Sequence, residues 1–106
     1  MAPKSTPPAP PRRVVVLGRP WALQATHGLL DDEGLFGDCD SRTDTIRYDA
    51  DQTPASKRDT VLHELVHAID ETLVLGMTER QVANLSTGLI LMLRDNPRLS
   101  QFLLTP

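Results

Sequence analysis

The sequence has little cysteine, few aromatic residues and no long apolar run. Cys39 is its single cysteine, so a disulfide within the chain is excluded. Aromatic residues make up 4%, which leaves few large side chains for a deep specificity pocket. No apolar run approaches the roughly 20 residues that span a bilayer, and the start of the chain lacks the apolar core of a secretory signal. We therefore expect a cytosolic protein.

The sequence also has no excess of basic residues. The chain has 11 Lys and Arg against 14 Asp and Glu, which gives a net charge of -3 at pH 7. Nucleic acids and anionic membrane surfaces attract basic proteins and give no electrostatic advantage to a mildly acidic one. We expect neither a nucleic-acid partner nor a membrane partner.

The length and composition are those of one small globular domain. A chain of 106 residues, 40% hydrophobic and 24% charged, is too short for two independent cores. Residues 1–12 contain five prolines and cannot form a hydrogen-bonded ladder or bury much apolar surface. We expect a disordered tail over residues 1–12 and a domain over residues 13–106.

The first half of the domain has the pattern of short strands. A β-branched run over residues 13–18 and an alternating segment over 43–49 each predict a strand. Residues 20–30 fit either a helix or a strand, and the strand is favoured. Acidic residues, glycine and serine make 31–34 and 37–41 typical of turns. The prediction is a small antiparallel sheet.

The second half has the pattern of helices. A helix is expected to begin at Ser56, with Asp59 completing an approximate capping box, and to run to about Leu75 before Gly76. A second capping box, Thr78 with Gln81, predicts another helix that ends at residues 96–97, and a last turn over residues 100–104 is expected to pack back on the core. The predicted fold class is α+β, a small antiparallel sheet packed on two or three helices.

The first of these helices carries the pattern His-Glu-x-x-His at His63, Glu64 and His67. Two imidazoles four residues apart project from one face and can share a divalent metal ion, and the spacing is typical of zinc sites. Glu64 would point beside the metal, where a carboxylate can take a proton from a water on the ion. The alternative is a core helix whose two histidines are merely hydrogen-bonded.

A catalytic zinc ion takes three protein ligands and leaves a fourth position to water, so a third ligand is needed. Glu79 is favoured because a short turn would fold the second helix back along the first. The helix dipole also favours an acidic residue in a first turn without any metal, so this assignment stays open. Glu71 and His27 are the reserve candidates.

Three further residues have other interpretations. Asp70 lies about 10 Å along the helix from His63, too far to bind the same ion easily, so we expect it to orient His67 or tether the helix from outside the ligand set. An ordinary solvated position is the alternative for Asp70. Gln81 is explained by the capping box, and Cys39 would be a softer zinc ligand in a segment that the sequence does not position.

With these residues in view, the chain resembles the small phage and bacterial zinc metallopeptidase-like proteins grouped near the ImmA/IrrE family, within the gluzincin class of zincins. The matching segments are residues 44–49, 60–70, 79–85 and 93–97, which together span most of residues 35–97. The His-Glu-x-x-His segment is specific for zinc, and the other three are weak on their own.

The resemblance implies further roles. In that family the strand before the motif helix is the edge along which an extended peptide aligns, which would assign Ile46, Arg47 and Tyr48 to substrate binding. The family's third ligand is a glutamate at the start of the following helix, which corresponds to Glu79. A second glutamate often follows two positions later, where this chain has Gln81.

Two functions follow as hypotheses. The first is zinc-dependent hydrolysis of a peptide or protein substrate, with Glu64 as general base. The alternative is a non-catalytic zinc-binding or protein-interaction domain of phage or bacterial origin. The number of protein ligands discriminates between them, because four favour a structural site and three favour catalysis.

Overall fold

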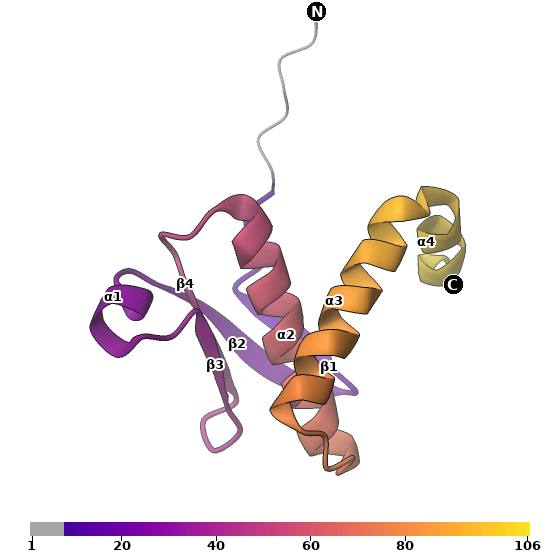
Figure 1. The fold of residues 1–106 in the computed structure, drawn as a ribbon. Coiled ribbons are helices and arrows are strands. Elements are labelled where there is room, and N and C mark those ends of the chain that lie inside the picture. The colour runs from indigo at the N-terminus through magenta and orange to yellow at the C-terminus, as the bar shows by residue number, and fades with distance from the viewer. Residues whose placement is uncertain (1–7) are drawn as a thin grey trace, which may run out of the picture.

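A sheet of four strands is covered on one face by a long helix, with a second long helix beyond it (Figure 1). The computed structural model describes residues 8–106. The predicted α+β class is confirmed. The elements in chain order are β1 (Arg13–Val16), β2 (Arg19–Thr26), α1 (Leu29–Glu33), β3 (Gly37–Asp40), β4 (Thr45–Asp49), α2 (Pro54–Leu73), α3 (Glu79–Asp95) and α4 (Pro97–Leu104).

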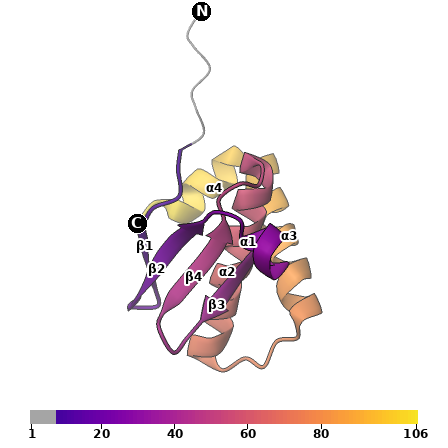
Figure 2. The same cartoon turned by 90° about the vertical axis from the view of Figure 1, so that its left-hand side faces the viewer.

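The sheet is mixed, and the expectation of a wholly antiparallel sheet is wrong in this respect. The order is β1-β2-β4-β3, in which the neighbours β1–β2 and β3–β4 are antiparallel and β2–β4 is parallel (Figure 2). The buried Ile46 and Tyr48 belong to β4, whereas β3 is the short polar sequence Gly-Asp-Cys-Asp. An apolar strand gains most in the middle of a sheet and a short charged strand suits an edge, so β4 lies inside and β3 outside.

Residues 37–40 form a strand, although glycine and aspartate there are typical of turns. Pairing with β4 and close packing on α2 override the weak strand propensity. A Cβ atom on Gly37 would lie 2.7 Å from Thr60 Cγ2 and 2.8 Å from the Arg47 carbonyl oxygen. Only glycine lets β3 approach α2 this closely. The strand favoured for residues 20–30 is confirmed over Arg19–Thr26, and the turn expected at 31–34 is largely the short helix α1.

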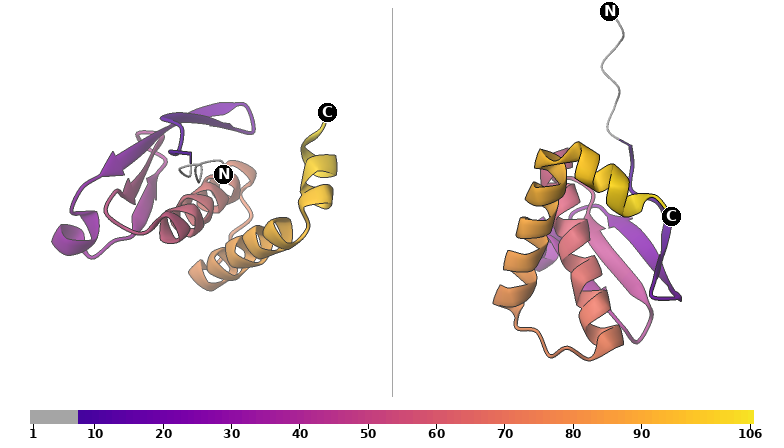
Figure 3. Two further views of the ribbon diagram at one scale, coloured as in Figure 1. Left: turned by 90° about the horizontal axis from the view of Figure 1, so that it is seen from above. Right: turned by 90° about the vertical axis from the view of Figure 1, so that its right-hand side faces the viewer.

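The core lies between the sheet and α2. Its buried members come from β1, β2, β4 and α2: Val16, Trp21, Leu23, Ile46, Tyr48 and Ala68. Helix α2 therefore has one face on the sheet and another face toward α3, and Figure 3 shows it between the two. This position leaves α2 rigidly held along the segment that carries the two histidines.

Helix α2 begins two residues earlier than the sequence predicted. Thr53, not Ser56, is the N-cap: its side-chain oxygen accepts a hydrogen bond from the Ser56 backbone N–H at 3.2 Å, and Pro54 occupies the first turn. Proline is favoured there because its missing N–H has no helical partner in any case. The helix ends at Leu73 with Val74 as its left-handed C-cap; Gly76 also has the expected positive φ of 70° but lies beyond the cap.

The capping box at the start of α3 is confirmed, with Thr78 and Gln81 bonding each other's backbone N–H groups. The predicted last turn is the helix α4, which packs against α3 and has no buried residue, so it does not reach the core as expected.

Of the predicted tail over residues 1–12, residues 1–7 lie outside the described part of the chain. Residues 8–12 belong to neither a helix nor a strand. Within residues 8–106, the helices are all too short or too polar to cross a membrane.

Candidate metal centre

Helix α2 presents His63 and His67 on the same face, as their spacing predicts. The two ring centroids are 5.0 Å apart, with the ring planes inclined by 64°. Each side chain is 25% exposed, so the imidazoles are partly shielded while their Nε2 atoms remain accessible from the α3 side. The pair is thus arranged to bind a common partner.

That partner is Glu79, the first residue of α3. Its Oε1 lies 2.6 Å from His63 Nε2, and its Oε2 lies 2.9 Å from His67 Nε2. One ligand atom from each of these three residues lies within 4.8 Å of the other two. The structure therefore brings together the three residues that the sequence suggested as metal ligands.

The loop between α2 and α3 holds Glu79 in this position. Asp70 Oδ1 accepts a hydrogen bond from the Met77 backbone N–H at 3.1 Å, and the capping box fixes the first turn of α3 immediately afterwards. Two roles were considered for Asp70, to orient His67 or to tether the helix. Its contact with Met77 corresponds to the second, because it ties α2 to the loop. The loop is therefore held at one end by Asp70 and at the other by the capping box, and this places Glu79 beside the histidines.

We predict that Asp70→Ala weakens the loop and lowers zinc affinity by about tenfold, the lower end of the range for losing a group that supports a metal ligand. Without the carboxylate, the Met77 N–H loses its partner and the position of Glu79 becomes less restricted. Asp70→Asn is the matched control, since its amide oxygen can still accept the hydrogen bond. Competition with a chromophoric chelator measures both affinities. Equal losses in the two variants would contradict the tethering role.

Glu64 lies beside the histidines on the sheet side of α2 and is only 5% exposed. Burial, reinforced by the negative charges of Glu79 and Asp38, raises the pKa of Glu64 to about 7. A divalent cation between the imidazoles would oppose both effects, because it favours the ionised carboxylate. The close approach of β3 contributes to this burial, since a Cβ on Gly37 would lie 3.3 Å from Glu64 Cγ.

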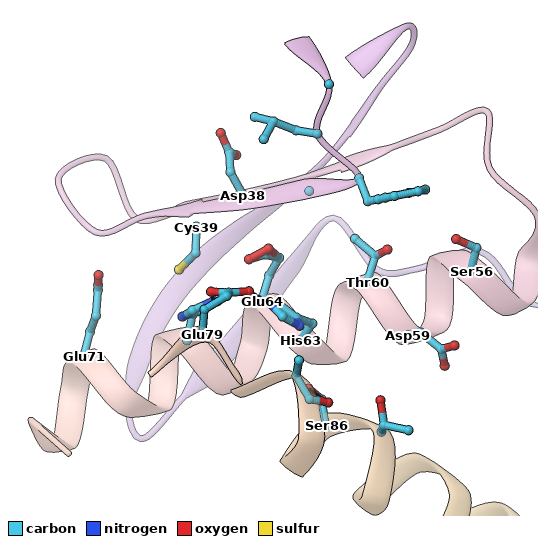
Figure 4. Close-up of a pocket in the computed structure, with 17 residues that line it drawn as sticks. Asp38, Cys39, Ser56, Asp59, Thr60, His63, Glu64, Glu71, Glu79 and Ser86 are labelled. Carbon is cyan, nitrogen blue, oxygen red and sulfur yellow. Dashed lines mark hydrogen bonds and ion pairs between the residues drawn. The ribbon is translucent and has the colours of Figure 1, made fainter. Parts of the chain in front are cut away.

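A cleft of about 710 Å³ opens over this centre (Figure 4). Strand β3 forms one wall, α3 forms the other, and α2 forms the floor that carries His63, Glu64 and His67. Thr60 and Glu71 extend the floor in the two directions along α2. The candidate base and the three candidate ligands therefore face the same solvent-accessible space.

The reserve ligands do not join this cluster. Glu71 lines the cleft but lies outside the three-residue group. His27 Nδ1 lies 2.9 Å from Asp51 Oδ1 at an exposed site elsewhere. Cys39 lines the cleft from β3, and burial, with the charge of Glu71 next in importance, raises the pKa of its thiol to about 12. Cys39 is not a member of the three-residue cluster of candidate ligands.

The expectation that Ile46, Arg47 and Tyr48 form the substrate edge is wrong. Strand β4 is paired on both sides, so its backbone groups are already used within the sheet. Ile46 and Tyr48 are buried in the core, and Arg47 forms ion pairs with Asp38 and Glu33. The edge strand that borders the cleft is β3. Its alternation of small residues with aspartate was the available signal, because a period of two is typical of a half-buried strand.

Comparisons with protein-family models, with curated proteins and with solved structures gave no match to this chain.

Proposed function

We propose that this domain is a zinc-dependent peptidase, with zinc held by His63, His67 and Glu79. The observation that carries the proposal is the meeting of both histidine Nε2 atoms with the two carboxylate oxygens of one glutamate, at 2.6 and 2.9 Å. Without a cation this arrangement concentrates three strong metal-binding groups at one point. The same proposal would place the chain with the ImmA/IrrE-like metallopeptidases that its sequence resembles.

The donor set fits zinc. Two neutral imidazoles and one carboxylate form a familiar catalytic zinc set, with ligand distances of about 2.0 to 2.2 Å. Around a tetrahedral ion such donors lie roughly 3.3 Å apart, and the three groups here lie within 4.8 Å of one another. Small rotations of exposed Glu79, whose side chain is 69% accessible, would adjust the spacing.

The three-residue set favours catalysis over a structural role. Structural zinc sites usually have four protein ligands, whereas catalytic sites have three and an open position. Among the residues that the structure describes, the candidate cluster has three members and faces a cleft. These observations support the peptidase over the non-catalytic zinc-binding domain.

A bound zinc ion would supply Lewis acidity toward a peptide carbonyl and would lower the pKa of a water at the open position. Glu64 lines the same cleft as the three candidate ligands and makes no competing ion pair among residues 8–106. Its carboxylate would accept a proton from the attacking water and return it to the departing amine. The free edge of β3 would align an extended peptide through backbone hydrogen bonds.

Peptide cleavage with and without zinc tests the proposal. The protein, stripped of metal and then reloaded with one equivalent of zinc, is incubated with a mixed peptide library, and products are identified by mass spectrometry. Cleavage is expected with zinc, loss of cleavage with a chelator, and recovery when zinc is restored. Binding of zinc without any cleavage would favour a non-catalytic zinc-binding domain, and absence of zinc binding would refute the peptidase and leave a protein-interaction domain.

A further inference from the structure

The two ends of the cleft differ in charge, and the difference centres on Glu71. His63, His67 and Glu71 are spaced four residues apart, so they follow one another along a single face of α2. Glu71 lies about 6 Å beyond His67 along the helix axis, at 1.5 Å per residue. Its side chain lines the same cleft as the candidate metal centre.

Glu71 extends from α2 toward the β3 side of the cleft, where Cys39 points back from the strand (Figure 4). After burial, the negative charge of Glu71 is the next cause that raises the pKa of Cys39. Glu71 is exposed, and within residues 8–106 it takes part in no hydrogen bond or ion pair of its side chain. It is therefore available to a ligand.

Arg19 is a basic residue whose pKa is affected by the charge of Glu71, but Arg19 makes its direct contacts with other groups. Its pKa is raised mainly by the hydrogen bond to Asp44, and Glu71 adds a smaller contribution. The guanidinium also donates to the Ser41 carbonyl oxygen at 2.9 Å and lies 4.9 Å from the centre of the Trp21 ring. Arg19 therefore bonds to other groups and forms no ion pair with Glu71 among the described residues.

The other carboxylates that line the cleft are paired, point elsewhere or would be compensated by zinc. Among residues 8–106 the cleft is lined by no lysine or arginine and by five acidic residues: Asp38, Asp59, Glu64, Glu71 and Glu79. Asp38 pairs with Arg47 and points away from α2, while Asp59 points away from β3 at the opposite end (Figure 4). A zinc ion would offset the charges of Glu64 and Glu79. Glu71 remains as the uncompensated charge that faces the β3 edge.

The register of a bound peptide relates Glu71 to a particular residue. A peptide along the free edge of β3 would advance about 3.3 Å per residue. Glu71 lies about 6 Å beyond His67 and about 9 Å beyond the midpoint of the two histidines, which corresponds to two or three residues from a carbonyl at the metal centre. A lysine or arginine side chain at that place has the length and the charge to meet the Glu71 carboxylate.

We infer that Glu71 makes the cleft selective for peptides with a lysine or arginine two or three residues from the bond that is cleaved, on the side that lies over the C-terminal part of α2. This inference rests on the proposed peptidase function. Because Glu71 is exposed, the interaction is screened by salt and contributes a modest factor. We expect about tenfold between otherwise identical peptides carrying Lys or Glu at that position.

Cleavage of a randomised peptide library by the zinc-loaded native protein tests the inference. Sequences around the cleaved bonds should be enriched in Lys and Arg at one position, two or three residues away. Glu71→Gln should remove the enrichment and Glu71→Lys should convert it to a preference for Asp and Glu. Asp95→Asn, which removes one charge at the exposed end of α3, is the matched control and should keep the native preference. An unchanged preference in Glu71→Gln, or loss of zinc from that variant, would overturn the inference.

A binding measurement separates this inference from the proposed function. In zinc-loaded Glu64→Gln, a fluorescent peptide with Lys at the selected position is compared with its Glu counterpart by anisotropy, with and without the additional change Glu71→Gln. If the native protein cleaves no peptide, cleavage cannot identify the selected position. The anisotropy measurement then compares fluorescent peptides that carry Lys or Glu at each position in turn. A Lys preference that disappears with Glu71 supports the selectivity even when no cleavage is found. Equal binding of both peptides overturns the selectivity even when the native protein cleaves.

Discussion

Replacement of Glu64 by glutamine is expected to lower the rate of peptide cleavage by about 10²- to 10⁴-fold, the range for losing a positioned general base. Glutamine has nearly the same shape but cannot accept the proton from the attacking water. Glu64 is 5% exposed and is not one of the three clustered metal-binding groups, so the substitution should disturb neither the helix nor zinc binding. Initial cleavage rates at equal zinc occupancy measure the effect.

Two controls make this result specific to the chemistry of Glu64. Zinc affinity of Glu64→Gln should remain within about tenfold of the native value, since the change lies next to the ligands but not among them. Asp95→Asn, with the same loss of one carboxylate far from the cleft, should retain native activity. Equal cleavage by the native protein and Glu64→Gln would remove Glu64 as the base.

Replacement of Glu79 by alanine is expected to lower zinc affinity by more than about 100-fold, beyond the usual cost of losing an outer supporting group. The variant leaves two imidazoles without the carboxylate that meets both of them. The side chain of Glu79 is 69% exposed, and its loss from the first turn of α3 should cost only about 0.3 to 1 kcal/mol of stability. Zinc competition assays and thermal unfolding of the metal-free protein separate the two effects.

Arg80→Ala is the matched control for Glu79→Ala. Arg80 is the next residue in the same turn, is exposed, and is absent from the lining of the cleft. Its zinc affinity should be native. Native zinc affinity in Glu79→Ala would show that another group completes the site, and Glu71 would then be the first candidate because it lies one turn beyond His67 in the same cleft.

The local parts of the centre could be predicted from the sequence. The relative positions of His63 and His67 follow from the repeat of one helix, and the capping box at Thr78 marks the start of the next helix. Because the loop between the helices is short, Glu79 could be anticipated near the histidines. What the sequence left open was whether its carboxylate points toward them, since the helix dipole alone explains an acidic first turn.

The long-range parts could not be predicted in the same way. Which strand borders the cleft depends on sheet order, and the parallel pairing of β2 with β4 places β3 at the edge. Local propensity indicated a turn at residues 37–41, because pairing and burial that favour a strand there come from β4 and α2. The contact of Asp70 with the Met77 N–H likewise depends on how the loop reverses.

The central claim is that His63, His67 and Glu79 bind one zinc ion and leave a position open. X-ray absorption at the zinc edge, on native protein loaded with one equivalent of zinc, tests it most directly. We expect two histidine nitrogens, one carboxylate and a light-atom ligand from water, with the carboxylate contribution lost in Glu79→Ala. A native protein that retains no zinc, or a spectrum unchanged by Glu79→Ala, would contradict it.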